Sequence, residues 1–217
     1  MPFTYEFARP SVTLDAAVLT VSEGELEILL IKRKHEPFAG SFALPGGFLE
    51  MSEEPSEGAK RELFEETGIQ PRELNPIFAC GQTGRDPRGR SITLVFGTLI
   101  RKDLFRPQGG DDASEAAWMK LLTPPRMAFD HARILREVFS SLRWQAITSV
   151  VGRNFLPPEF TEDELVSLQR AIHVDSVRES PLERGKNLRI IREGSRPGLW
   201  RFDVSFPDQP DFVPLPW

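Results

Sequence analysis

Residues 46–69 of this 217-residue chain read GGFLEMSEEPSEGAKRELFEETGI, and they constrain the fold more than any other stretch. Two glycines precede a segment that predicts an α-helix over 55–67, with proline in its first turn and glycine just past its end. Positions i, i+3 and i+4 of a helix share one face, so Glu62, Glu65 and Glu66 crowd three carboxylates together. Carboxylates held this close repel one another, which indicates a cationic partner.

A divalent cation is the simplest such partner. Hard carboxylate oxygens suit Mg²⁺ or Mn²⁺, and ligation would replace the repulsion. Arg61 stands next to the cluster and can hold a carboxylate by a charge-assisted hydrogen bond. Gly46 and Gly47 let the backbone approach a metal or a phosphate, where a side chain would obstruct it. The alternative is a solvated acidic helix face, and local spacing alone leaves both readings open.

Composition bounds the class of protein. The chain is 40% hydrophobic and 27% charged, with a net charge of −5, as expected for a soluble globular protein. Its single cysteine, Cys80, excludes a disulfide within the chain, and its apolar context predicts a buried side chain. The N-terminal sequence has no signal-peptide pattern, and no apolar run is long enough to span a membrane. We therefore expect a cytoplasmic protein that does not bind membranes.

The pattern of elements predicts an α+β protein of two parts. Residues 1–148 form the first, with helices over 55–67 and 130–144 and strands over 11–21, 25–33, 41–44, 76–82, 91–100 and 115–120. Residues 149–206 form the second: a helix over 161–172 with a capping box, a poorer helix over 176–188, and a hairpin of 188–193 with 199–204. Helix, helix and hairpin in this order are typical of a winged helix. Residues 207–217 are rich in proline, which predicts an extended tail.

The opening segment, taken whole, resembles the Nudix box, G-x5-E-x7-R-E-U-x-E-E-x-G-U, in which U is aliphatic. The matching residues are Gly47, Glu53, Arg61, Glu62, Leu63, Glu65, Glu66, Gly68 and Ile69. The resemblance implies a Nudix fold, in which a mixed sheet lies between helices. It also implies cleavage of a nucleoside diphosphate that is linked to another group.

The same resemblance implies roles for individual residues. Glu62 and Glu66 are expected as direct ligands of Mg²⁺ or Mn²⁺, with the Gly47 carbonyl as a further ligand. Glu65 is expected as a third ligand or as the group that activates the attacking water. Glu53 and Arg61 are expected to orient the catalytic helix. Gly46 and Glu50 are expected beside the substrate. The sequence does not identify a general base outside the box.

Two further stretches indicate a substrate class. Residues 85–90, RDPRGR, resemble the loop of ADP-ribose pyrophosphatase-like Nudix proteins, so Arg85 and Arg88 are candidates to bind phosphate. A solvated hairpin turn is the alternative. Residues 128–131, AFDH, resemble a subgroup linked to NAD metabolism, with His131 as a polar partner of Asp130, a base or a helix cap. Four aromatic residues could stack on a base or belong to the core: Phe38, Phe42, Phe48 and Phe129.

The two-part layout resembles the Nudix-related transcriptional regulators of NAD metabolism. In those proteins the Nudix domain senses ADP-ribose or a related nucleotide and a winged helix binds double-stranded DNA. Residues 176–201 hold seven basic and three acidic residues within an acidic chain, as a DNA-reading patch would. The candidate DNA contacts are Arg178, Arg184, Lys186, Arg189 and Arg196. A degenerate module that only packs on the first domain is the alternative, and the likeness implies a homodimer.

Two functional hypotheses follow. The first is a metal-dependent hydrolase of ADP-ribose or a related nucleoside diphosphate derivative, favoured because every position of the box is filled. The second is a nucleotide-sensing transcriptional regulator with little or no hydrolysis. The sequence separates neither ADP-ribose from similar substrates nor one operator from another.

Overall fold

The computed structural model describes residues 5–105, 113–172 and 180–203. The larger part of the chain contains two α-helices, α1 (Pro55–Thr67) and α2 (His131–Thr148), and a short 3₁₀ helix at Lys102–Leu104. Its strands are β1 (Ser11–Ser22), β2 (Glu25–Arg33), β3 (Phe42–Ala43), β4 (Gly46–Phe48), β5 (Asn75–Cys80), β6 (Ser91–Leu99) and β7 (Ala113–Lys120).

The seven strands form one mixed sheet. The path through it is β3-β2-β1-β6-β5, with β4 beside β1 and β7 beside β2. Strands β1 and β6 pair in parallel from Ser11 and Ser91 to Leu19 and Leu99, and the other pairs are antiparallel. β1 is therefore central, with β4 against its first half and β2 against its second half. This places the glycine-containing strand β4 beside the start of β1.

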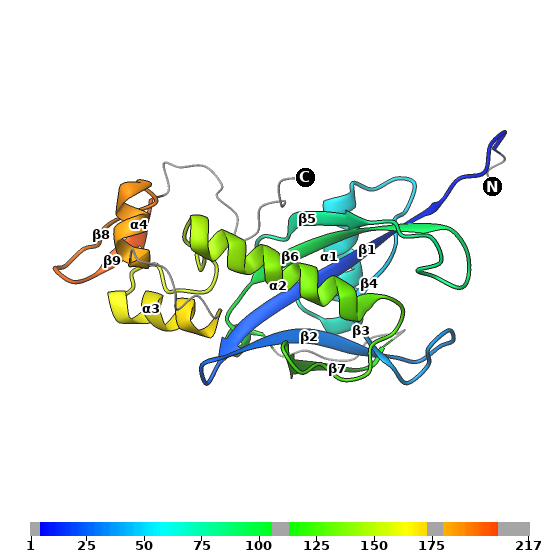
Figure 1. Ribbon diagram of the computed structural model, residues 1–217, viewed down its shortest axis with the longest axis horizontal. Coiled ribbons are helices and arrows are strands. Elements are labelled where there is room, and N and C mark those ends of the chain that lie inside the picture. Colours follow the sequence, from blue (N-terminus) through cyan, green and yellow to red (C-terminus); the bar gives the residue numbers. More distant parts are fainter. Residues whose placement is uncertain (1–4, 106–112, 173–179, 204–217) are drawn as a thin grey trace.

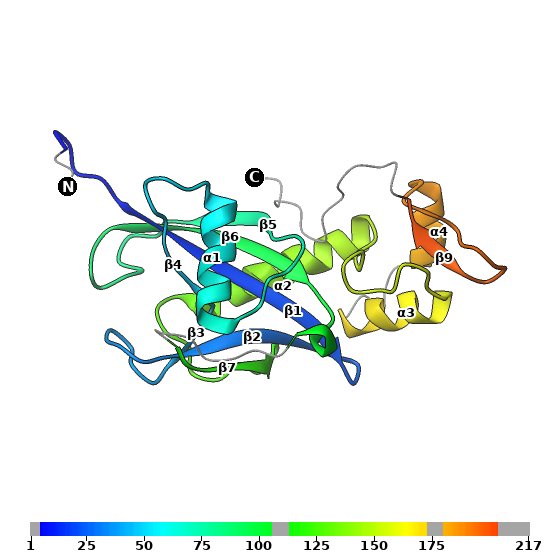
Figure 2. The same ribbon diagram turned by 180° about the vertical axis from the view of Figure 1, so that it is seen from behind.

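The sheet lies between the two long helices, α2 on one face (Figure 1) and α1 on the other (Figure 2). Alternation along β1 supplies both faces, as the period of a strand requires. Leu14, Ala16 and Val18 pack in the cluster that contains Leu63 of α1. Ala17 and Leu19 pack in the cluster that contains residues of α2. The expected fold, a mixed sheet between helices, is confirmed.

The C-terminal part contains α3 (Glu162–Ala171), α4 (Pro181–Asn187), β8 (Ile191–Glu193) and β9 (Trp200–Phe202), with β8 and β9 forming a hairpin. Thr161 caps α3 in a capping box with Glu164, as predicted. This part lies at the end of α2 away from β3 and β4 (Figure 1). The order helix, helix, hairpin is the predicted one, although α4 begins only at Pro181 and residues 173–179 lie outside the described residues.

Local sequence signals explain both the correct bounds of α1 and the failure to predict β4. The predicted helix over 55–67 has the bounds of α1, because Pro55 starts it and Gly68 ends it in the left-handed conformation, with φ 70°. Strand β4 was missed, since two glycines indicate a turn. In the described ranges, every helix is too short or too polar to cross a lipid bilayer.

Candidate active site

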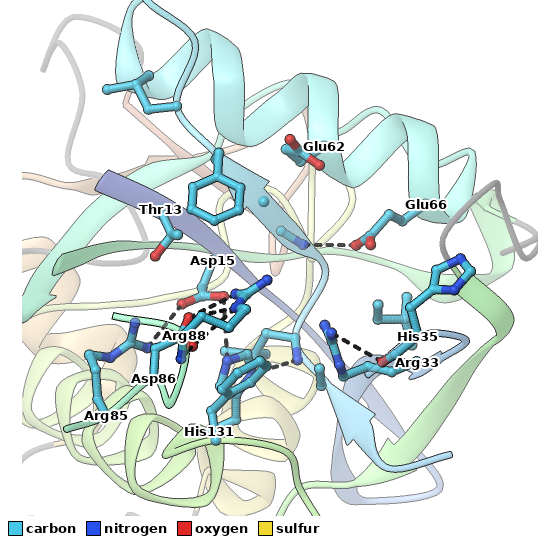
Figure 3. Close-up of a pocket in the computed structure, with 18 of the residues that line it drawn as sticks. Thr13, Asp15, Arg33, His35, Glu62, Glu66, Arg85, Asp86, Arg88 and His131 are labelled. Atoms are coloured by element: carbon cyan, nitrogen blue, oxygen red, sulfur yellow. Dashed lines mark hydrogen bonds and ion pairs between the residues drawn. The ribbon is translucent and has the colours of Figure 1, made fainter. Parts of the chain in front are cut away.

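A pocket of about 410 Å³ opens between the acidic face of α1 and the loops opposite it (Figure 3). Glu62 and Glu66 line one side of it. The other side carries Asp15 of β1, the loop with Arg85, Asp86 and Arg88, and His131 at the start of α2. Segments that are far apart in the sequence thus meet at one pocket, and it unites the box with both of the additional motifs, RDPRG and AFDH.

The glycine pair brings the backbone of β4 against α1. Gly46 has φ 155°, and a Cβ on it would lie 2.0 Å from the Leu14 carbonyl oxygen. A Cβ on Gly47 would lie 2.4 Å from the Glu62 carboxyl carbon. At Gly46 the clash is with backbone, so only glycine fits there; at Gly47 a Cβ would instead push the Glu62 carboxylate away from the strand. The Gly46 N–H donates to Glu66 Oε2 at 2.8 Å, which fixes this carboxylate beside the strand.

Arg61 organises the acidic residues around it. Its Nε and Nη2 donate to the two carboxylate oxygens of Glu53 at 3.0 and 2.8 Å. Its Nη1 donates to Glu62 at 2.9 Å and to Glu65 at 3.1 Å. Hydrogen bonding to Arg61 lowers the pKa of Glu53 to about 2, so this pair stays charged at neutral pH. The guanidinium therefore ties the loop before α1 to the acidic turn of the helix.

The carboxylates nearest Gly47 make a donor set for a hard cation. Glu62 and Glu66 lie four residues apart on the face of α1 that lines the pocket. Burial raises the pKa of Glu62, and the charges of Glu65 and Glu53 act in the same direction against the opposing effect of Arg61. A cation beside this carboxylate would offset that cost. The absence of a Cβ at Gly47 leaves its backbone open to the same space.

Glu65 lies differently from its two neighbours. Its side chain is 54% exposed, it bonds Arg61, and it does not line the pocket. In the described part of the chain, no three histidine, cysteine, aspartate or glutamate side chains surround one point as they would around a bound ion. Glu62 and Glu66 instead accept hydrogen bonds from Arg61 and from Gly46. The role expected for Glu65 stays a prediction.

The two arginines of the RDPRG loop differ in their accessibility. Arg85 has a side chain only 5% exposed, and its guanidinium donates to both Asp130 oxygens at 3.1 and 2.9 Å. Burial works to raise the pKa of Asp130, but the hydrogen bond and charge of Arg85 outweigh it and lower that pKa. Arg88 is 45% exposed and makes a bidentate pair with Asp86, in which Nε donates to Oδ1 at 3.0 Å and Nη2 to Oδ2 at 2.7 Å. Of the two, Arg88 is the better placed to meet a ligand, and Arg85 contributes to the wall of the pocket.

Aromatic rings flank the exposed arginine. The Arg88 guanidinium carbon lies 5.3 Å from the Phe48 ring centroid and 5.5 Å from that of Phe129. Arg33 approaches the same Phe129 ring at 4.9 Å. Phe48 is half exposed and both rings line the pocket, whereas Phe42 packs against the main core cluster and Phe38 packs edge-on to Phe129. Phe48 and Phe129 are thus the two candidate stacking rings that reach the pocket.

Asp15 is a pocket residue that the sequence reasoning missed. It is buried in β1, accepts a hydrogen bond from the Thr93 hydroxyl at 2.6 Å and lies 3.7 Å from His131 Nε2. A charged residue inside the otherwise apolar run LDAAVL was the available signal. Arg33 was missed too, because it ends a strand that reads as ordinary. Cys80 is buried, as predicted, with its thiol 3.3 Å from Asp130 Oδ2.

The candidate DNA contacts differ in their accessibility. Arg189 and Arg196 are exposed near the hairpin, and Lys186 is partly covered, with its ammonium 4.1 Å from the Trp200 ring centroid. Arg178 lies outside the described residues. Arg184 corrects our expectation: it is only 6% exposed and donates to the carbonyl oxygens of Ala146 and Ser149 at the end of α2. It joins the two parts of the chain and is not available to DNA.

A mixed sheet between two helices, with a glycine pair facing an E-x-x-E-E helix, is the Nudix arrangement. The chain belongs to the Nudix family: the family model described as the NUDIX domain matches residues 12–138.

Two relatives differ in what their names describe. An ADP-ribose pyrophosphatase of Methanocaldococcus jannaschii is 40% identical over 140 residues, which cover 64% of this chain and 77% of that protein. The ADPR responsive transcriptional repressor NtrR of Acinetobacter baylyi is 30% identical over 192 residues, covering 87% of this chain and 75% of the repressor. The structure of Shewanella oneidensis NrtR complexed with a 27mer DNA matches with a TM-score of 0.73 and 25% identity, covering 88% of this chain and 93% of that one. The expected resemblance to a two-part Nudix regulator is therefore confirmed.

Proposed function

We propose that this chain is a metal-dependent Nudix hydrolase that cleaves the diphosphate of ADP-ribose or a related nucleoside diphosphate derivative. The observation that carries the proposal is the pairing of Glu62 and Glu66 with the glycine strand: Gly46 donates to Glu66, and Gly47 faces the Glu62 carboxylate. A structural helix does not need this geometry, in which a Cβ at Gly46 would clash with the backbone of β1 and a Cβ at Gly47 would displace the Glu62 carboxylate.

Glu62, Glu66 and the Gly47 carbonyl would hold Mg²⁺ or Mn²⁺, with Glu65 as a further ligand or as the base. When bound, such an ion supplies neutralisation of the diphosphate and a lowered pKa for a bound water. The chain itself orients the groups. Glu53 fixes the Arg61 guanidinium, and this guanidinium in turn holds the carboxylates of Glu62 and Glu65 in place by hydrogen bonds. Positioning of this kind contributes much of the rate enhancement in enzymatic phosphoryl transfer.

The substrate class follows from the wall opposite the acidic helix. Arg88 is exposed there for contact with phosphate, and Phe48 and Phe129 offer faces on which a base can stack. Glu50 also lines the pocket, and Gly46 brings backbone to it. The M. jannaschii relative, an ADP-ribose pyrophosphatase, makes ADP-ribose the first substrate to test.

The test is hydrolysis of a nucleotide panel with Mg²⁺ or Mn²⁺, comprising ADP-ribose, NADH, nucleoside diphosphate sugars and nucleoside triphosphates. We expect ADP-ribose to be hydrolysed to AMP and ribose 5-phosphate, with both products detected by chromatography. Addition of EDTA should abolish this hydrolysis. Absence of turnover across the panel with either metal would reject the hydrolase proposal.

A second function has its own support. The C-terminal hairpin exposes Arg192, Arg196 and Arg201, Arg189 is exposed just before it, and the A. baylyi relative is an ADPR responsive repressor. We propose, as the alternative, that the chain senses a nucleotide and binds double-stranded DNA as a homodimer through this basic hairpin. The two proposals are compatible, because a hydrolase can consume its own effector.

DNA binding is tested by titrating labelled duplex DNA at several salt concentrations. Arg196→Ala should weaken binding and reduce the slope of log affinity against log salt by about 1, the share of one phosphate contact. Arg72→Ala, an exposed arginine of the first domain, is the matched control. Failure of the wild-type chain to bind duplex DNA at low salt would remove this alternative.

A further inference from the structure

The turn that precedes α2 contacts two separate walls of the pocket. Its backbone extends the edge of the sheet: the Phe42 N–H donates to the Arg126 carbonyl at 3.0 Å, and the Ala128 N–H donates to the Phe42 carbonyl at 2.7 Å. Phe129 follows with φ 49°, an unusual conformation for a phenylalanine, and the next two side chains make the contacts to the two walls. Those side chains are Asp130 and His131, to which the box assigns no role.

His131 holds the segment that leads into the glycine strand. Its Nδ1 accepts a hydrogen bond from the Leu44 N–H at 3.0 Å, and the side chain is 7% exposed. This bond requires a neutral ring with its proton on Nε2, which lies 3.7 Å from Asp15 Oδ1. Leu44 lies two residues before Gly46, so the imidazole acts on the strand whose N–H bonds Glu66. A shift of Leu44 would move Gly46 and Gly47 relative to both carboxylates.

Asp130 holds the opposite loop. It occupies the N-cap position of α2, yet its side chain makes no capping hydrogen bond. Both of its oxygens instead accept from Arg85, the first residue of the RDPRG loop. Arg85 Nη1 also donates to the Ser91 hydroxyl, which anchors the loop to the start of β6. Asp130 therefore sets the base of the loop that carries Arg88.

We propose that Asp130 and His131 are positioning residues for the hydrolase site, with divided tasks. His131 sets the glycine strand against Glu62 and Glu66, and thereby the metal site. Asp130 sets the RDPRG loop, and thereby the contacts to substrate. The adjacent side chains keep the two walls in a fixed relation, because Asp130 is the N-cap and His131 the first residue of one helix. The part of this inference that is tested by enzyme kinetics rests on the proposed function. The part that is tested by metal binding does not require turnover.

The first experiment measures Mn²⁺ affinity of the full chain from the EPR signal of free Mn²⁺. His131→Asn keeps an acceptor near the position of Nδ1, and His131→Leu removes it at similar size. We expect His131→Leu to weaken Mn²⁺ binding at least tenfold, and His131→Asn to stay within threefold of wild type. Equal losses in both variants, no loss in His131→Leu, or a wild-type chain that does not bind Mn²⁺ would each overturn the role of His131.

Two further variants separate positioning from general destabilisation. Val138→Ala removes buried volume from the same helix, remote from the pocket, and should leave Mn²⁺ affinity unchanged. Loss of affinity in Val138→Ala equal to that in His131→Leu would overturn the proposal. If His131→Leu does not fold, His131→Gln replaces it, because its amide reaches toward the position of Nε2 and cannot accept from Leu44.

The second experiment is steady-state hydrolysis of ADP-ribose. We expect Asp130→Asn to raise KM at least fivefold with kcat within twofold, and His131→Leu to lower kcat at least tenfold. The same pattern of changes in both variants would overturn the division of tasks. A wild type that binds Mn²⁺ without hydrolysing any nucleotide would reject the proposed function, and the comparison of His131→Asn with His131→Leu would still decide the inference.

Discussion

At the scale of single residues, the site depends on two glycines as well as on its charges. The carboxylates of α1 could sit on any exposed helix, but their approach to β4 requires positions without a Cβ. The identity of these residues was predictable from the sequence, because the spacing of the box is long and specific. Asp15 had a local signal, its charge within an apolar run, but its pairing with His131 and that of Arg85 with Asp130 were not predictable, because partners from distant segments leave no local pattern.

Gly47→Ala tests this directly. The new methyl carbon would lie 2.4 Å from the Glu62 carboxyl carbon, so the carboxylate must move away. We expect kcat for ADP-ribose hydrolysis to fall on the order of 100-fold, the cost of a small misplacement in an active site. Gly89→Ala is the matched control, since a Cβ there meets no atom within 4 Å. Similar kinetics for Gly47→Ala and wild type would contradict the geometry described for this pair.

At the scale of elements, α2 connects the pocket to the C-terminal part. Its first residue bonds Leu44, and the carbonyl groups near its last turn accept from Arg184 of α4. The sequence predicted the helix from its apolar period but ended it at residue 144 rather than Thr148. Arg184 was misassigned because seven basic residues near one another resemble a surface patch, and sequence alone does not show which of them turns inward.

Arg184→Ala should destabilise the fold. It leaves the Ala146 and Ser149 carbonyl groups without this buried charged donor, which costs about 2–4 kcal/mol in the free energy of unfolding. Urea unfolding followed by circular dichroism measures the change. Arg196→Ala, on the exposed turn of the hairpin, should change stability by less than about 0.5 kcal/mol. Equal stability of the two variants would show that the Arg184 contacts contribute little.

The start of α2 predicts a pH dependence of stability. Burial lowers the pKa of His131 below its ordinary value of 6.5, although Asp15 and Asp130 act in the opposite direction. Below pH 6.5 the unfolded chain takes up a proton on this imidazole and the folded chain does not. Stability is therefore complete above pH 6.5 and is lost as pH falls, by up to about 1.4 kcal/mol per pH unit.

The comparison is between wild type and His131→Asn, which has no titrating group at this position. The free energy of unfolding is measured in urea from pH 7.5 to 5. We expect the difference between the two proteins to shrink as pH falls. A difference that stays constant over this range would mean that the pKa of His131 is the same in the folded and unfolded states, and would contradict the effect of burial.

At the scale of the whole molecule, the two parts share one hydrophobic core. The cluster that contains Ile28 of the sheet and Val138 of α2 continues through Val150 to Leu165 of α3 and Ile191 of β8. The expected domain boundary at residue 148 stays a prediction. The hydrophobic core runs across this position without a break, although the sequence composition changes there. Such packing gives the C-terminal part a structural role in addition to any role with DNA.

The central claim is that Glu62 and Glu66 form the metal site of a hydrolase, and Glu66→Gln tests it most directly. The substituted amide oxygen can still accept from the Gly46 N–H, so the fold should persist while one negative ligand is lost. ADP-ribose turnover with Mg²⁺ is measured alongside ADP-ribose binding by calorimetry. We predict that wild type turns over ADP-ribose, and that Glu66→Gln binds it but loses at least about 100-fold in kcat. Unchanged turnover in Glu66→Gln would contradict the assignment of this site.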